Sequence, residues 1–141
     1  MTRTASPDIA ANSLDIKNIL LVDDDVQLAH ALKDLLEAHN FLVTTVSNGA
    51  EALREVMSMD FDVIVCDMMM PQMPGDMFYL AVQKTKPDLA RRFLFITGHG
   101  DNPKVDSFLK GINGLVIFKP VKTDELVRMI GLVMSRSEGL A

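Results

Sequence analysis

The sequence is poor in cysteine, in long apolar runs and in positive charge. Cys66 is the only cysteine among 141 residues, so no disulfide can form within the chain and a reduced, buried thiol is expected. No apolar run approaches the roughly 20 residues of a membrane span, and polar groups interrupt the N-terminal segment where a signal peptide needs an apolar core. The formal net charge of -5 argues against nonspecific binding to nucleic acid. These absences predict a cytoplasmic protein with neither a membrane nor a nucleic acid as partner.

The remaining composition is that of one globular domain. The hydrophobic content of 48% and the charged content of 23% are ordinary for such a domain, and no solenoid repeat is present. Residues 1–16 are mixed in Thr, Ser, Ala, Pro and Asp, which predicts a mobile tail. The folded domain is expected over 17–136, with a short C-terminal tail at 137–141.

Short apolar runs alternate with stretches of helical periodicity. Strands are expected near residues 18–23, 41–46, 62–66, 92–97 and 115–118. Helices are expected near 26–38, 49–58, 76–85, 103–110 and 123–135. Pro103 suits the first turn of its helix, and Thr123 suits an N-cap. The pattern predicts an α/β fold in which a doubly wound parallel sheet carries helices on both faces.

Polar residues stand at the ends of four of the five apolar runs, where the strands are expected to end. Asp23 and Asp24 follow the first run, Asp67 the third, Thr97 the fourth and Lys119 the fifth. Because ligands bind at the carboxyl ends of the strands in open α/β sheets, we expect these groups to converge on one site. Three carboxylates in one pocket repel each other unless a cation neutralises them. Oxygen ligands without Cys or His suit Mg²⁺, or alternatively Mn²⁺, beside a phosphate group.

These residues carry a family resemblance. The chain has Asp23-Asp24, then Asp67 followed by Met70-Pro71 and Gly75, then Thr97-Gly98, then Lys119-Pro120. Thr97 follows Asp67 by 30 residues, and Lys119 follows it by 52. Over roughly residues 18 to 135 the sequence closely resembles the receiver domain of bacterial two-component response regulators, of the chemotaxis type. The resemblance implies a flavodoxin-like fold of five strands in the order 2-1-3-4-5.

The resemblance also implies a role for each site residue. Asp67 would accept a phosphoryl group and become an aspartyl phosphate. Asp24 would bind Mg²⁺ directly and Asp23 would bind it mainly through water, and Asp67 and the backbone carbonyl of Met69 would complete the protein ligands.

Two further residues would contact the phosphoryl group. Lys119 would neutralise one phosphoryl oxygen, and the Thr97 hydroxyl would donate a hydrogen bond to another. The implied donors are a sensor histidine kinase or a histidine phosphotransfer protein, and the implied receiver of the signal is a downstream protein. The domain would catalyse its own phosphorylation and dephosphorylation, without turnover of external substrates. We also expect a cis peptide bond between Lys119 and Pro120.

Other conspicuous residues are interpreted as structural. Asp25 is expected to cap the following helix rather than to bind metal. Methionines 68, 69 and 70 are expected to fill gaps beneath a loop. His30 and His39 are expected on a solvated surface, and His99, close to the site, is expected to influence access or hydrolysis modestly.

Several alternatives stay open at this point. With only "SRSEGLA" after the last helix, a stand-alone regulator is favoured, although a receiver module from a hybrid histidine kinase fits as well. A haloacid-dehalogenase-type phosphatase needs an acid two residues after its nucleophile, where this chain has Met69. A flavodoxin-like cofactor module needs a Ser/Thr/Gly-rich loop where this chain has three aspartates. The chain also departs from the receiver pattern at Val116, where receivers commonly have an aromatic residue or His, so we expect the output to depend on residues 98–113.

Overall fold

The computed structural model describes residues 16–70, 72–98, 102–112 and 114–140. The strands are β1 (Asn18–Val22), β2 (Leu42–Val46), β3 (Val63–Asp67), β4 (Phe93–Thr97) and β5 (Leu115–Phe118). The helices are α2 (Val26–Ala38), α3 (Gly49–Ser58), α4 (Gly75–Thr85), α5 (Pro87–Ala90), α6 (Pro103–Ile112) and α7 (Thr123–Leu140). The tail expected at 1–16 and the residue His99 lie outside the described residues, apart from Ile16.

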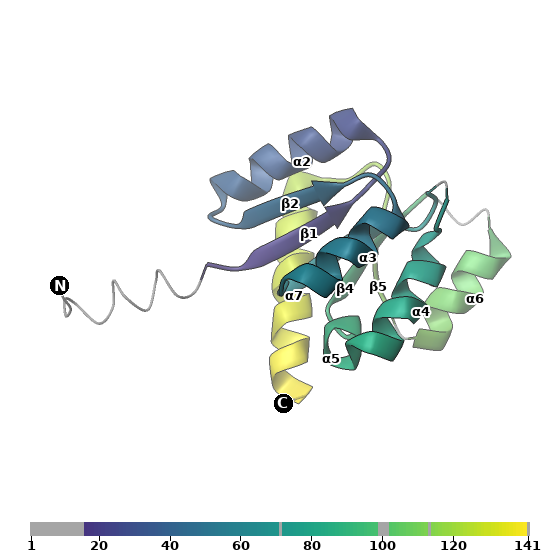
Figure 1. Ribbon diagram of the computed structural model, residues 1–141. Coiled ribbons are helices and arrows are strands. Elements are labelled where there is room, and N and C mark those ends of the chain that lie inside the picture. Colours follow the sequence, from purple (N-terminus) through teal and green to yellow (C-terminus); the bar gives the residue numbers. More distant parts are fainter. Residues whose placement is uncertain (1–15, 71, 99–101, 113, 141) are drawn as a thin grey trace.

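The five strands form one parallel sheet in the order β2-β1-β3-β4-β5, which confirms the expected topology. Figure 1 shows α7 behind the strands and α3, α4 and α6 in front of them. Successive side chains of a strand point to opposite faces, so each buried strand contributes to two apolar layers. One layer joins residues such as Ile19 and Leu94 to α2 and α7, and the other joins Leu20 and Phe95 to α3, α4 and α6.

Helix starts follow local signals in the sequence. The side chain of Asp25 accepts a hydrogen bond from the Leu28 amide at 3.0 Å, so this residue caps α2 as expected. Asn48 caps α3 in the same way, because its side chain accepts from the amide of Glu51 at 2.9 Å. Pro103 is the first residue of α6, where its missing N–H costs no helical hydrogen bond.

Three predictions about the elements were wrong in detail. The four-residue helix α5 was not expected, because so short a segment shows no helical periodicity. Thr123 is the first helical residue rather than the N-cap, since the carbonyl of Lys122 already accepts a helical bond from Leu126 at 2.9 Å. The last helix continues to Leu140 instead of ending at 135, because the segment after that point contains no proline to stop it.

Within the described residues, no helix is long and apolar enough to cross a membrane.

Candidate functional site

The side chains expected at the strand ends come from neighbouring strands. Asp67 is the last residue of β3 and pairs in register with Ile96, which places Thr97 one step further along β4. Thr97 pairs with Phe118, the residue before Lys119. The carboxyl ends of parallel strands lie at the same edge of a sheet. The polar residues that follow these strands in the sequence therefore lie next to one another at that edge.

The acidic residues form a tight cluster at this edge. Carboxylate oxygens of Asp23, Asp24 and Asp67 lie within 4.8 Å of one another. Asp23 and Asp67 are buried, with 1% and 2% of their surfaces exposed, whereas Asp24 is exposed. Asp25 contributes its backbone amide, which donates to Asp23 Oδ1 at 2.9 Å, and directs its own carboxylate to the helix cap.

The buried position of Asp23 disfavours its charged form. Its Oδ2 atom is buried without a hydrogen-bond partner. Burial raises the pKa of Asp23 from 3.8 to about 6; the Asp25 amide opposes this rise, and the negative charge of Asp67 adds to it. A buried, unpartnered carboxylate oxygen beside two further carboxylates fits a hard divalent cation such as Mg²⁺, which binds oxygen ligands.

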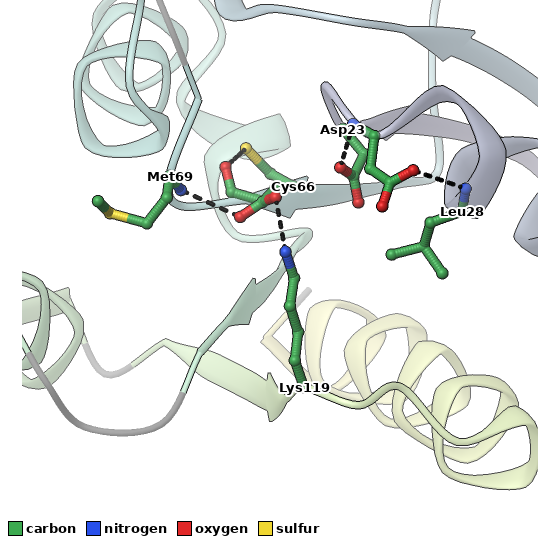
Figure 2. Close-up of polar contacts among 7 residues, drawn as sticks. Asp23, Leu28, Cys66, Met69 and Lys119 are labelled. Atoms are coloured by element: carbon green, nitrogen blue, oxygen red, sulfur yellow. Dashed lines mark hydrogen bonds and ion pairs between the residues drawn. The ribbon is translucent and has the colours of Figure 1, made fainter.

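Lys119 reaches Asp67 from the end of β5 (Figure 2). Its ammonium donates a hydrogen bond to Asp67 Oδ2 at 3.0 Å, an ion pair with a buried carboxylate. Burial alone lowers the pKa of Lys119, but the hydrogen bond and charge of Asp67 and the charges of Asp23 and Asp24 outweigh burial and raise it. The ammonium is therefore charged across the physiological range. The Lys119-Pro120 peptide bond is cis, as predicted.

The second oxygen of Asp67 has its own donor. The Met69 amide donates to Asp67 Oδ1 at 3.0 Å. A dashed line from the Met69 nitrogen marks this hydrogen bond in Figure 2. Sequence reasoning considered only the carbonyl of Met69 and missed this amide, because a backbone donor leaves no signature in residue type. With Lys119 on one oxygen and Met69 on the other, the carboxylate of Asp67 is held in one orientation.

The glycine of the motif allows close packing behind the site. A Cβ atom on Gly75 would lie 2.9 Å from the carbonyl oxygen of Asp67 and 3.0 Å from the Cα of Met68. The Gly75 amide in turn donates to the Met68 carbonyl at 3.2 Å. Only glycine lets α4 begin this close to the end of β3, and any larger residue would displace the backbone that orients Asp67.

The remaining residues behave largely as expected. Met68 and Met70 are buried in the core, which confirms their packing role. The same prediction was wrong for Met69, because 57% of its surface is exposed. Cys66 is buried and free, and burial raises the pKa of its thiol well above the ordinary value. His30 and His39 are exposed, and His39 contacts the Leu35 carbonyl at 3.0 Å.

Residues 19–131 match the family described as response regulator receiver domain, so the chain belongs to that family and is a receiver domain of two-component response regulators. This family assignment argues against the two alternatives considered from the sequence, a haloacid-dehalogenase-type phosphatase and a flavodoxin-like cofactor module. The chain is 31% identical over 122 residues to the transcriptional regulatory protein GlrR of Escherichia coli, an alignment that covers 85% of this chain and 27% of that protein. It spans about a quarter of the length of the first curated relatives that it matches.

Solved structures agree with this family. A receiver domain protein from Clostridium thermocellum is 29% identical and superposes with a TM-score of 0.77, covering 89% of this chain and all of the other (100%). The signal receiver domain of a signal transduction histidine kinase from Syntrophus aciditrophicus is 27% identical, with a TM-score of 0.75 and coverage of 84% and 90%. Similar domains are therefore found both in regulators and in kinases.

Proposed function

We propose that this receiver accepts a phosphoryl group on Asp67 and thereby changes its interaction with a downstream protein. The observation that carries the proposal is the environment of Asp67: a buried carboxylate bonded at 3.0 Å to the Lys119 ammonium and at 3.0 Å to the Met69 amide. The Lys119 and Met69 donors orient the carboxylate of Asp67, which is the proposed nucleophile. The adjacent carboxylates of Asp23 and Asp24 would bind a cation. Phosphoryl transfer requires this kind of positioning and charge neutralisation more than further covalent chemistry.

The transfer step uses groups of this chain and a donor. An oxygen of Asp67 forms a bond to phosphorus while the phosphorus–nitrogen bond of a phosphohistidine breaks, and the leaving imidazole takes up a proton. Lys119 then neutralises an oxygen of the transferred group, and Thr97 donates to another. Mg²⁺ would be held by Asp24 directly, by Asp23 through water, and by Asp67 and the Met69 carbonyl. When bound, it would neutralise phosphoryl charge.

The proposed partners follow from this chemistry. A sensor histidine kinase or a histidine phosphotransfer protein would supply the phosphoryl group, and an unidentified protein would receive the signal. The relatives named as transcriptional regulators are longer proteins, and this acidic chain of net charge -5 offers no electrostatic attraction for nucleic acid. That this receiver is a stand-alone regulator stays a prediction. Measuring the mass of the native protein in its source cells tests it.

Intact-mass measurement tests the phosphoacceptor. Incubation with Mg²⁺ and acetyl phosphate should add one acid-labile phosphoryl group to the wild type and none to Asp67→Asn. The matched control is Asp34→Asn, an exposed aspartate on α2, which should be phosphorylated like the wild type. An equal gain in mass for Asp67→Asn would contradict the assignment.

A further inference from the structure

A small cavity lies at the amino-end edge of the sheet. Its walls include Phe93 and Leu115, the first residues of β4 and β5. Asp67 is the last residue of β3, so the cavity and the phosphoacceptor edge are at opposite ends of the parallel strands. The cavity has a volume of about 90 Å³. A drug-sized ligand needs roughly 300 to 1,000 Å³ and a water molecule takes up about 30 Å³, so this cavity suits a small ion.

The charged side chains of this cavity are all positive. Among the described residues that line it, Arg91 and Arg136 carry charge, and none is an aspartate or a glutamate. This contrasts with the whole chain, in which 19 acidic residues outnumber 14 lysines and arginines. A guanidinium has five N–H donors in a planar arrangement that can bind two oxygens of an oxyanion at once. The lining of the cavity therefore favours an anion.

The two arginines come from opposite faces of the sheet. Arg91 directly follows α5, which packs in the layer of α4, whereas Arg136 belongs to α7, which packs in the other layer. In Figure 1, α5 and the C-terminal part of α7 lie at the same end of the molecule. Two positive charges at one cavity repel each other, and an anion between them removes this repulsion.

A tyrosine hydroxyl adds a neutral donor. Tyr79 of α4 is buried and lines the same cavity. Burial raises the pKa of this phenol, and the positive charge of Arg136 opposes the rise, so the guanidinium and the hydroxyl lie near each other. The hydroxyl is protonated at physiological pH and can donate a hydrogen bond to an anion.

The other walls of the cavity are apolar or have no side chain. Phe93 and Phe95 supply aromatic surface. Gly114 forms part of the wall between α6 and β5, and its amide donates to the Leu109 carbonyl at 3.0 Å. A Cβ atom on Gly114 would lie 3.3 Å from the ring of Phe95. Mostly apolar walls with a few convergent donors are typical of small-ligand sites, and donors attract an anion more strongly there than in open water.

We propose that this cavity, which we call the arginine pocket, binds a phosphate dianion between Arg91, Arg136 and Tyr79. The two guanidinium charges match the charge of a dianion, whereas a monocarboxylate leaves one of them uncompensated. The Tyr79 hydroxyl donates to a further oxygen. Bound phosphate joins α4 and α7 across the amino-end edge and stabilises the folded protein. The proposal is independent of the proposed function, because no residue of the phosphoacceptor edge takes part.

Titration calorimetry with sodium phosphate tests the arginine pocket. The full chain is titrated in metal-free buffer at about pH 8, with the ionic strength held constant by sodium chloride. The wild type should bind one phosphate with a Kd of about 1 mM or below. Arg91→Gln and Arg136→Gln should each weaken binding roughly tenfold, because each removes charge-assisted hydrogen bonds. Tyr79→Phe keeps the ring and should weaken binding roughly threefold.

Controls separate this pocket from general attraction of anions. Arg54→Gln removes an exposed arginine of α3 that does not line the cavity, and this variant should bind phosphate like the wild type. Sodium acetate should bind at least about tenfold more weakly than phosphate, because it carries one charge. Glycerol 3-phosphate distinguishes an esterified from a free phosphate: tighter binding of the ester would support the pocket and assign it an esterified ligand.

Amide chemical shifts locate the bound anion. In spectra of the ¹⁵N-labelled protein, phosphate should shift the amide signals of Gly114 and Leu115 and leave those of Asp67 and Lys119 in place. If Arg136→Gln does not fold, Arg91→Gln at an exposed position still decides the question. The proposal is overturned if the wild type binds no phosphate, if Arg91→Gln binds it equally well, or if the shifts are confined to the phosphoacceptor edge.

Discussion

The three central strands β1, β3 and β4 bury apolar side chains on both faces, whereas their carboxyl ends bury Asp23, Asp67 and Thr97. Within the described residues, these three are all of the buried polar side chains. The sheet interior therefore gains stability from close packing, while the edge concentrates negative charge that lowers it. This difference is typical of functional sites, which are stable only because the rest of the domain compensates for them.

Truncating the interior should give the largest effect. Phe78 on α4 is fully buried and contacts Phe93 with ring centroids 5.5 Å apart. Phe78→Ala should lower the free energy of unfolding by about 3 to 5 kcal/mol, because it removes apolar contact and leaves a cavity. Urea denaturation measures this loss. A change below about 1 kcal/mol would mean that the interior is less tightly packed than the structure indicates.

Neutralising a carboxylate at the carboxyl-end edge of the sheet should raise the free energy of unfolding rather than lower it. In the absence of Mg²⁺, Asp23→Asn should raise the free energy of unfolding at pH 7 by about 2 to 3 kcal/mol, because it removes a buried carboxylate without a partner for one oxygen. Urea denaturation in the presence of a chelator measures the gain. The matched control is Asp34→Asn, an exposed aspartate, which should change stability little.

The stabilisation by Asp23→Asn should depend on pH. The pKa of Asp23 is about 6 in the folded protein and 3.8 as the ordinary value, so the folded state keeps this proton at higher pH than the unfolded state does. Below the ordinary value both states are protonated and the charge costs nothing. The cost grows as the pH rises from about 4 to about 6 and then stays constant. A stability difference between variant and wild type that is independent of pH would contradict this account.

Metal binding should distinguish two adjacent aspartates. Asp24→Ala should weaken Mg²⁺ binding by about tenfold or more, since the carboxylate of Asp24 belongs to the cluster. Asp25→Ala should change Mg²⁺ affinity much less, because the Asp25 carboxylate accepts from the Leu28 amide instead. Isothermal titration calorimetry gives both affinities. Equal losses would mean that the two carboxylates have been assigned the wrong roles.

The smallest effect should come from the helix cap. Asp25→Ala should destabilise the fold by about 1 kcal/mol, the usual cost of removing a capping side chain. Asp25→Asn retains an acceptor for the Leu28 amide and should recover most of this loss. Thermal unfolding of the two variants provides the comparison. The same stability for both would show that the cap contributes nothing.

Local pattern within the sequence determined the alternation of strands and helices, and with it the parallel sheet. A strand and its following helix are encoded in neighbouring residues, and right-handed crossovers leave few topologies. The same rules predicted that Asp23, Asp24, Asp67, Thr97 and Lys119 would come from one edge of the sheet, and resemblance to a family supplied the strand order. The ends of elements were less accurate: α5 was missed and α7 is longer than expected.

Only the tertiary structure decided how the groups at that edge differ from one another. The burial of Asp23 and its unpartnered oxygen, the Met69 amide on Asp67 and the close approach that requires Gly75 all depend on backbone brought together from separate segments. The ring contacts among Tyr79, Phe95 and Phe108 likewise join α4, β4 and α6. Sequence spacing specifies which residues reach an edge, but solvation, hydrogen-bond partners and ring contacts depend on distances that arise only when the chain folds.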